Sequence, residues 1–272
     1  IGGLFGTCFL IGNMLAWAVL GRSLVSSGWR SVFLIPPLAL IMMALAFYLL
    51  VSDEPRGRRV LRKADISNAR SNLLHIFSSR RLITIAIAYA LLQFVRSGLT
   101  LWAPIFVFEK YRLSLDVASY VASVIPLGGI VGSIASGWIS DRTKKFGKTS
   151  IISTLTLLLS LTILTFYDAS SYGLPIGMML LFSSGFLLYG PHVIMVTVVP
   201  MEEKETYGAA GVAGFIDGIG YISLMFADPL IGWVLDFQGW SGVVTFQLIS
   251  SLSAAFLILT LWRDEVRRIK ST

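Results

Sequence analysis

The sequence predicts an all-α integral membrane protein, and three features of its composition and pattern support this fold class. Of the 272 residues, 55% are hydrophobic and only 14% are charged, whereas a soluble domain carries about 25% charge. The apolar residues gather in runs close to the length of about 20 residues that a helix needs to cross a bilayer core. Within these runs they do not alternate with period two, as they would in a membrane β-barrel. Helices are the remaining way to satisfy backbone polar groups in lipid.

Eight apolar runs qualify as membrane-spanning helices, each bounded by charged residues, glycine or proline. The first run begins at Ile1, without a methionine or a charged segment, so the chain does not start like a natural N-terminus or a signal peptide. Six tryptophans lie toward the ends of the runs, as interfacial aromatic residues do: Trp17, Trp29, Trp102, Trp138, Trp233 and Trp240. The runs cover residues 1–21, 32–51, 82–108, 117–139, 149–167, 173–199, 207–235 and 241–262.

The lysines and arginines predict the orientation of the chain. The segments 52–81, 140–148 and 200–206 and the C-terminal tail contain eight, four, one and four of them, which is 17 of the 22. The positive-inside rule places these connections in the cytoplasm. The net charge of +7 is therefore a topology signal. It does not indicate a nucleic acid partner, because the basic residues do not share one solvated face.

The long basic segment 52–81 is the predicted boundary between two parts of the chain. Residues 1–51 precede it with two spans, and residues 82–272 follow it with six spans and a tail. The segment is expected to be either a solvated linker or a linker with a short surface helix around residues 65–78.

The sequence contains no recognisable catalytic or metal-binding motif. The single cysteine, Cys8, excludes an internal disulfide and a cysteine-cluster metal site. The patterns H-E-x-x-H and G-x-S-x-G, the P-loop and the dinucleotide fingerprint are all absent from the sequence. We therefore expect no cofactor, no metal and no enzymatic activity.

Arg96 is the residue whose position is most expensive in lipid. It lies 14 residues into the run that begins at Leu82, about 21 Å deep at 1.5 Å per residue. A lipid-facing arginine there would cost at least about 2.5 kcal/mol, so Arg96 must face a cavity or a partner. Its fork of donors suits phosphate or carboxylate oxygens. We expect an anion-binding residue, and the alternative is a structural ion pair with Asp217 or with another helix.

Two carboxylates lie in the seventh run. Asp217 is ten positions past Tyr207, and Asp228 follows eleven residues later, three helical turns on, so both share one face. Asp217 is a candidate for carrying a coupling proton, because burial favours the protonated carboxyl. It can equally neutralise Arg96 or join two helices. Asp228 precedes Pro229 and is expected at the membrane interface.

Three further polar residues are candidates for the site. Tyr189 and Gln93 are expected to add hydrogen bonds to a bound anion, and Gln93 projects from a face next to that of Arg96. His192 can pack against a neighbouring helix or relay protons. It has no metal partner, because the other histidine, His75, lies in the cytoplasmic loop.

Small residues recur every three or four positions in two of the runs. Such faces let helices approach closely, so we expect helix contacts there. The members are Gly128, Gly132 and Ser136, then Gly129, Ser133 and Gly137, and in the seventh run Gly211, Gly214 and Gly218.

The segment 137–148 follows the fourth run on the cytoplasmic side. It resembles the signature loop G-x-x-x-D-R/K-x-G-x-R/K of the major facilitator superfamily, with looser spacing before its second glycine. An aspartate in this loop can cap a helix start, and the cations can bridge to a neighbouring helix end. The matching positions are Gly137, Asp141, Arg142, Gly147 and Lys148.

The resemblance implies where the eight spans stand in a larger design. In this superfamily the loop occurs between helices 2 and 3 and again between helices 8 and 9 of a twelve-helix fold. If segment 137–148 is the second copy, the chain holds helices 5 to 12, which is eight of twelve. Residues 1–51 are then the last two helices of the N-terminal bundle, 52–81 is the cytoplasmic central loop, and 82–272 is the C-terminal bundle with its tail.

Several other stretches are similar to segments of the organophosphate:phosphate antiporter family within this superfamily. That family exchanges phosphorylated sugars or glycerol phosphate for inorganic phosphate. The resemblance implies one site arginine in helix 1 and one in helix 7, and Arg96 matches the second. The similar stretches are residues 95–104, 185–191, 211–221 and 236–240, with 28–33 resembling the usual entry to helix 6.

The chain departs from this family at two positions. Members for glycerol and hexose phosphates often carry a histidine in helix 5 shortly before a V-G-x stretch. Here Ile11-Gly12-Asn13 fits that stretch, but Cys8, Phe9 and Leu10 precede it. Asp217 replaces a residue that is usually small, which would suit a proton-coupled symporter.

The resemblance therefore implies a secondary active transporter of an organic anion, working by alternating access around a midplane site. The substrate would be a phosphorylated sugar, glycerol phosphate or a related anion, exchanged for phosphate or coupled to protons. The alternative is a transporter-like sensor that binds the anion and signals through a partner. We expect a monomer in the cell membrane with a cytoplasmic C-terminus, whose partners are the lipid bilayer and the anionic substrate.

Overall fold

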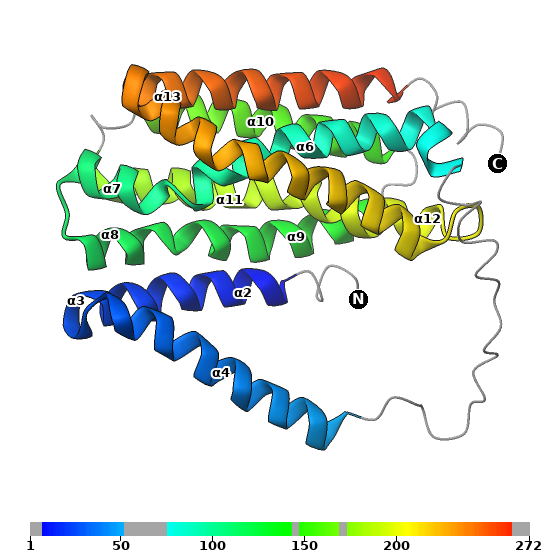
Figure 1. Cartoon of the computed structure of the whole chain (residues 1–272). Coiled ribbons are helices and arrows are strands. Elements are labelled where there is room, and N and C mark those ends of the chain that lie inside the picture. Colours follow the sequence, from blue (N-terminus) through cyan, green and yellow to red (C-terminus); the bar gives the residue numbers. More distant parts are fainter. Residues whose placement is uncertain (1–6, 52–74, 143–146, 169–172, 263–272) are drawn as a thin grey trace.

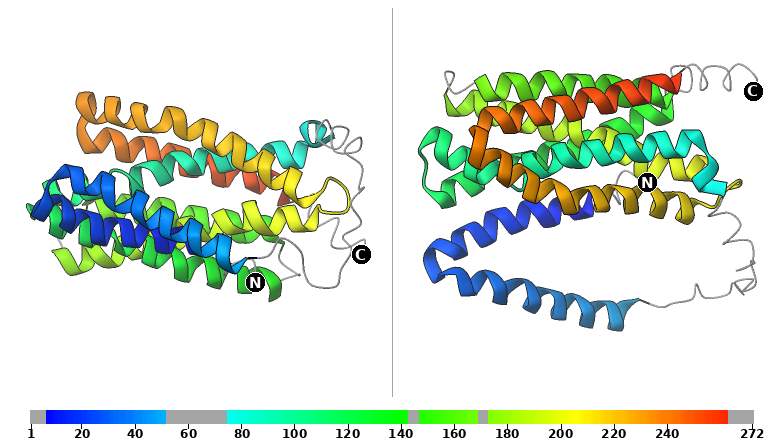
Figure 2. Two further views of the ribbon diagram at one scale, coloured as in Figure 1. Left: turned by 60° about the horizontal axis from the view of Figure 1, so that its bottom comes forward. Right: turned by 45° about the horizontal axis from the view of Figure 1, so that its top comes forward.

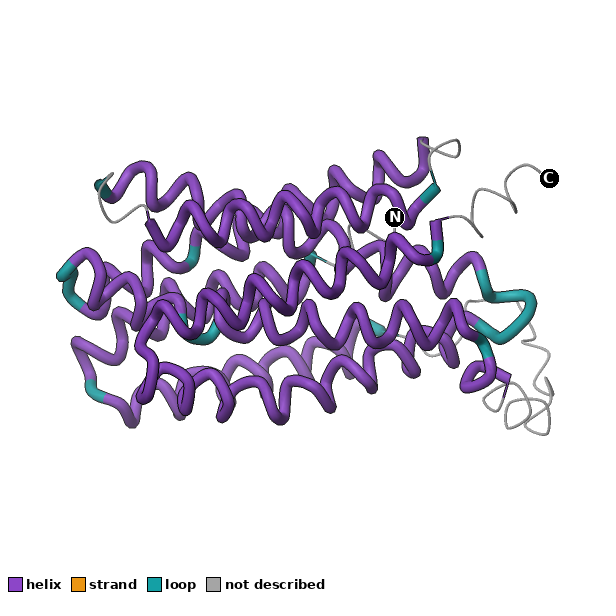
Figure 3. The backbone as a smooth tube through the Cα atoms, turned by 90° about the horizontal axis from the view of Figure 1, so that it is seen from above, coloured by secondary structure: helices purple, strands orange, loops and turns teal. Residues whose placement is uncertain are grey.

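The fold is all-helical in the part of the chain that the computed structural model describes, residues 7–51, 75–142, 147–168 and 173–262. Figure 3 shows long helices joined by short connections in these segments, which confirms the predicted fold class. The elements are α2 (Cys8–Leu15), η1 (Ala16–Leu20), α3 (Gly21–Ser27), α4 (Trp29–Leu50), α6 (Arg80–Thr100), α7 (Ala103–Tyr111), α8 (Leu115–Ala122), α9 (Val124–Arg142), α10 (Lys148–Asp168), α11 (Leu174–Val193), η3 (Ile194–Val198), α12 (Val199–Glu202) and α13 (Ala209–Thr260).

The eight predicted spans are all present among the described residues. Seven continuous helical stretches there are long and apolar enough to cross a membrane. One of them, α13, has 52 residues and turns back on itself at Gly239, whose φ of 65° and ψ of −166° are not helical. Its two arms form a hairpin in Figure 1 and correspond to the seventh and eighth spans. Glycine tolerates this positive φ at no steric cost.

Two spans that the sequence predicts as continuous are broken. The run 82–108 divides into α6 and α7, because Pro104 stands in the first turn of α7, where its missing N–H costs nothing. The run 117–139 divides at Ser123 into α8 and α9. The bounds of these runs were therefore wrong, although α6 alone and α8 with α9 are long and apolar enough to cross a membrane.

Two other spans contain a π-helical turn. The stretch α2–η1–α3 continues to Ser27, beyond the predicted end at residue 21, and α11–η3–α12 has a similar turn at residues 194–198. Such turns insert one extra residue and often lie at functional sites. Because the first helix is longer than predicted, Trp17 lies well inside it and not toward its end.

The helices pair in a pattern that brings α2, α6, α9, α11 and α13 around one region. The first arm of α13 packs along α6, its second arm packs on α10, and α9 packs along α11. The helix α2–η1–α3 lies against α8 and α9, whereas α4 diverges from the bundle with none of its residues buried. Figures 1 and 2 show α4 leaning away from the other helices.

The contact between α9 and α11 depends on glycine. A Cβ atom on Gly128 would lie 2.0 Å from the carbonyl oxygen of Phe182, and one on Gly132 would lie 2.3 Å from that of Phe186. The predicted close approach is thus confirmed for α9. It is wrong for Gly214 and Gly218 of α13, where an added Cβ would meet nothing within 4 Å.

The predicted domain boundary lies largely outside the described residues, which omit 52–74. Residues 75–78 are helical, and Ile76 among them is buried against the bundle. The division of the chain at this segment therefore stays a prediction.

Candidate functional site

Arg96 lies half-buried in α6, between the buried residues Val95 and Ser97. Its guanidinium carbon is 5.6 Å from the ring centre of Phe9 on α2 and 6.0 Å from that of Tyr221 on α13. In the described part of the chain it makes no ion pair within 4 Å. Its described neighbours are therefore two aromatic rings and not a carboxylate. Anion binding by Arg96 stays a prediction.

An aromatic cluster adjoins Arg96. The ring of His192 lies 5.3 Å from that of Tyr89, 5.7 Å from that of Tyr189 and 6.2 Å from that of Phe9. Tyr189 is buried and also contacts Phe9 edge to face at 5.8 Å. His192 therefore packs among aromatic rings from α2, α6 and α11. A proton relay through His192 stays a prediction.

The carboxylates of α13 both face α6, as their spacing predicted. The hydroxyl of Tyr89 donates a hydrogen bond of 2.9 Å to Oδ1 of Asp217, and the hydroxyl of Ser97 donates to Oδ1 of Asp228. Between them, Ser223 donates to the carbonyl oxygen of Ala90 at 2.8 Å. Asp217 is thus bonded to a tyrosine and not to Arg96, so these side chains join two helices.

Gln93 lies one turn before Arg96 but points to a different neighbour. Its side chain is 1% exposed, and it packs with Tyr89 against Gly220, where an added Cβ would lie 3.2 Å from Cγ of Gln93 and 2.2 Å from the Tyr89 ring. Its amide nitrogen has no hydrogen-bond partner among the described residues. A contact between Gln93 and a bound anion stays a prediction.

The sequence reasoning missed Phe9, Tyr89 and Tyr221 as members of this site. Tyr89 precedes Arg96 by seven residues, which is two turns on one helix face, and Tyr221 follows Asp217 by four. Both spacings place the tyrosine on the same helix face as a candidate site residue, and could have predicted its membership in the site. Phe9 gave no such signal, because its approach depends on how α2 packs on the C-terminal helices.

The predicted signature loop lies far from this cluster, at the ends of α9 and α10. Gly137, Asp141 and Arg142 belong to the last two turns of α9, and the guanidinium of Arg142 lies 4.1 Å from the ring centre of Trp138. Gly147 has a φ of 71° directly before α10. Residues 143–146 lie outside the described segments, so the capping role of Asp141 stays a prediction.

The expected bridge from the loop to a neighbouring helix end is present. Lys148, the first residue of α10, forms an ion pair with Glu202 at the end of α12. Arg81 of α6 pairs with Glu203 and, at 3.5 Å, with Glu202. These four residues, which we call the Glu202 ion cluster, connect three helix ends.

We expect the Glu202 ion cluster to contribute little to stability, because the side chain of Glu202 is 38% exposed and exposed ion pairs are worth about 0–1 kcal/mol. Glu202→Gln should lower the thermal unfolding midpoint in detergent by at most about 4 °C. The difference should shrink in 1 M NaCl, where the screening length falls to about 3 Å. Glu205→Gln, an exposed neighbour, is the matched control. A fall of more than about 10 °C would contradict this expectation.

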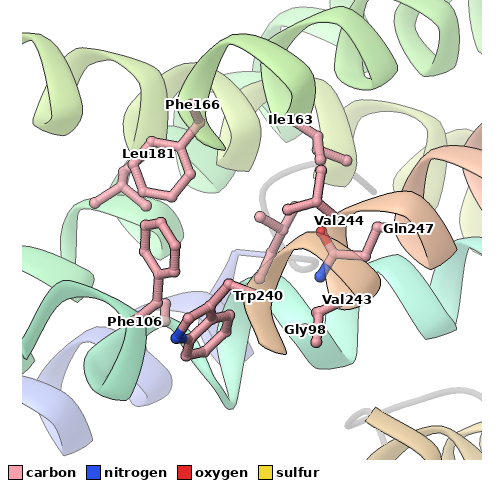
Figure 4. Close-up of a pocket in the computed structure, with 11 residues that line it drawn as sticks. Gly98, Phe106, Ile163, Phe166, Leu181, Trp240, Val243, Val244 and Gln247 are labelled. Atoms are coloured by element: carbon pink, nitrogen blue, oxygen red, sulfur yellow. The ribbon is translucent and has the colours of Figure 1, made fainter. Parts of the chain in front are cut away.

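A small cavity of about 30 Å³ lies inside the bundle formed by α6, α7, α10, α11 and α13 (Figure 4). Phe106, Phe166 and Trp240 line it, and its one polar side chain, Gln247, lies against Gly98 of α6. It has room for about one water molecule. This cavity is therefore too small and too apolar to hold an organic anion.

Several helices long and apolar enough to span a bilayer, packed around a half-buried arginine, define a multi-pass helical membrane protein. The comparison with known families agrees. The chain belongs to the Major Facilitator Superfamily, whose sequence model matches residues 2–227.

The chain is similar to curated members of this superfamily along most of its length. The glycerol-3-phosphate transporter of Bacillus subtilis is 29% identical over 85% of the chain, and a probable hexose phosphate transport protein of Chlamydia pneumoniae is 24% identical over 98%. The membrane sensor protein UhpC of Escherichia coli is 23% identical over 94%. The chain spans 56%, 64% and 61% of the length of these three relatives.

Proposed function

We propose that this protein is a secondary active transporter that moves an organic anion, an organophosphate such as a phosphorylated sugar or glycerol phosphate, by alternating access. The observation that carries the proposal is Arg96, a cation half-buried in a membrane span without an ion-pair partner among the described residues. A charge in that position is stabilised when an anion binds it. The named activities of the two transporter relatives support phosphate esters as its ligands.

Arg96 would bind the phosphate group through its planar fork of donors, which matches two phosphate oxygens at once. Tyr189 lies within reach of the same region, since its ring contacts the Phe9 ring over which Arg96 lies. Exchange for inorganic phosphate suits a site whose main recognition element is one anion-binding cation. Proton coupling would instead use Asp217, which accepts a hydrogen bond from Tyr89, or His192 of the aromatic cluster.

The location follows from the same proposal. A multi-pass helical protein of this family would lie in the cell membrane, with the basic connections and the C-terminus in the cytoplasm. The relatives are transporters and a sensor by name, which supports a function without catalysis.

The alternative is a membrane sensor that binds the anion and signals through a partner protein. The similarity to UhpC favours it specifically. The transporter and the sensor both need the same anion site. Only the transporter would also move the anion across the membrane.

The test is uptake of labelled glycerol 3-phosphate by proteoliposomes that contain the full-length protein. We expect uptake when the vesicles are loaded with inorganic phosphate and little uptake when they are empty. Uptake into empty vesicles driven by a pH gradient would show proton coupling in place of exchange. Binding of the ester without uptake under either condition would refute transport and favour the sensor.

A further inference from the structure

A second cavity, of about 120 Å³, lies beside the anion site between α2–η1, the end of α6, the α8–α9 junction and α11. Its polar and aromatic members are Asn13, Trp17, Thr100 and Tyr189, and apolar side chains of α8 and α9 form the rest of the wall. We call it the Asn13 cavity. It is four times as large as the cavity of Figure 4 and, unlike that one, combines hydrogen-bonding groups with an aromatic face.

The Asn13 cavity lies about one helical turn from the Arg96 site, and it is lined there by one residue of α6 and one of α2. Thr100 follows Arg96 by four residues and its hydroxyl donates a hydrogen bond of 2.6 Å to the Arg96 carbonyl oxygen. Asn13 follows Phe9 by four residues, and Phe9 is the residue of α2 that contacts Arg96. Figure 1 shows α2 and α6 running in the same direction. Asn13 and Thr100 are therefore displaced in the same direction from Phe9 and Arg96, by about 6 Å along each helix.

Tyr189 connects the anion site and the Asn13 cavity. It lines the cavity, and its ring also contacts Phe9 and His192 of the aromatic cluster. A molecule bound at Arg96 and longer than phosphate would therefore extend along Tyr189 into the Asn13 cavity.

The groups in the cavity fit a hydroxylated carbon chain. The amide of Asn13 offers a donor and an acceptor, and neither has a partner in the described part of the chain. The Thr100 hydroxyl donates to the backbone and can still accept a hydrogen bond. The flat ring of Trp17 offers an apolar face to C–H groups.

We propose that the Asn13 cavity binds the polyhydroxylated carbon portion of a phosphate ester whose phosphate lies at Arg96. This inference rests on the proposed function and adds the residues that recognise the organic part of the ligand. A site built to hydrogen-bond hydroxyl groups discriminates strongly against ligands that lack them. Asn13, Trp17 and Thr100 thus distinguish phosphate esters of sugars or polyols from inorganic phosphate.

The test is equilibrium binding of glycerol 3-phosphate, glucose 6-phosphate and inorganic phosphate to the purified full-length protein, followed by titration calorimetry. Asn13→Leu keeps the size of the side chain and removes its hydrogen bonds. We expect its Kd for each ester to rise about tenfold, the loss of one to two hydrogen bonds, and its Kd for inorganic phosphate to stay unchanged. Thr100→Val, on the other helix, should show the same selectivity, and Leu15→Val, on the exposed face of α2, is the control.

Three outcomes would overturn the inference. The first is ester binding that neither variant changes. The second is an equal loss of affinity for the esters and for inorganic phosphate. The third is an unmodified protein that binds no phosphate compound, which would refute the proposed function as well. Binding that passes this test without flux in proteoliposomes would support the inference and refute transport, so the two failures are distinguishable.

Discussion

Arg96→Lys should lower the rate of glycerol 3-phosphate uptake by at least about tenfold. Lysine keeps the charge but presents a point ammonium in place of the planar fork that matches a phosphate. Loss of one hydrogen bond to a charged group costs about 1.5–3 kcal/mol, and the lower figure is a factor of about ten. The surroundings strengthen the expectation, because the Phe9 ring beside Arg96 offers no hydrogen bond that could replace one from the guanidinium. The measurement is initial uptake into phosphate-loaded proteoliposomes.

The matched control for this change is Arg80→Lys. Arg80 begins the same helix, α6, and is exposed at its N-terminal end. It should transport at the unmodified rate, so that reconstitution and folding are tested by the same chemical substitution. Unchanged uptake in Arg96→Lys would sink the assignment of Arg96 to the anion site.

Gly132→Ala should destabilise the folded protein by about 2–3 kcal/mol, the cost of overpacking a close contact. The new methyl group would lie 2.3 Å from a backbone carbonyl oxygen of α11, and a backbone atom cannot rotate away as a side chain can. The thermal unfolding midpoint in detergent should fall by roughly 4–12 °C for a chain of this size. Fluorescence-detected size-exclusion after heating would measure it.

Gly214→Ala provides the comparison, since an added Cβ there meets nothing within 4 Å. Alanine is also the better helix former by about 1 kcal/mol, so the midpoint should stay the same or rise slightly. The two substitutions are chemically identical and differ only in what surrounds them. Equal falls for both would show that the α9–α11 contact does not depend on glycine.

The features that could be predicted from the sequence are those whose free-energy cost in the bilayer depends on a single residue or a single apolar run. Arg96 stood out because a charge in lipid is expensive wherever it points. The spans stood out because each must cover the bilayer by itself. Asp217 and Asp228 could be placed on one face because both belong to one helix, and their hydrogen bonds to Tyr89 and Ser97 confirm that face.

The features that it missed depend on contacts between distant segments. The residues around Asp217 do not show whether its partner is Tyr89 or Arg96, because both partners lie on α6. The partner is decided by how far α6 and α13 are shifted along each other. The position of Trp17 depended on where its helix ends, and the helix continues to Ser27, beyond the predicted end at residue 21. The open surroundings of Gly214 show the same limit, because small-residue spacing predicts a contact without naming a partner.

The glycine contact between α9 and α11 has a mechanical consequence. With glycine backbones of one helix in van der Waals contact with carbonyl groups of the other, the pair has no compressible layer of side chains between its axes. We therefore expect α9 and α11 to move as one rigid unit. Helix α9 ends in Asp141 and Arg142, and helix α11 contains Tyr189 and His192. We therefore expect that a displacement of the loop end of α9 would also move Tyr189 and His192 on α11.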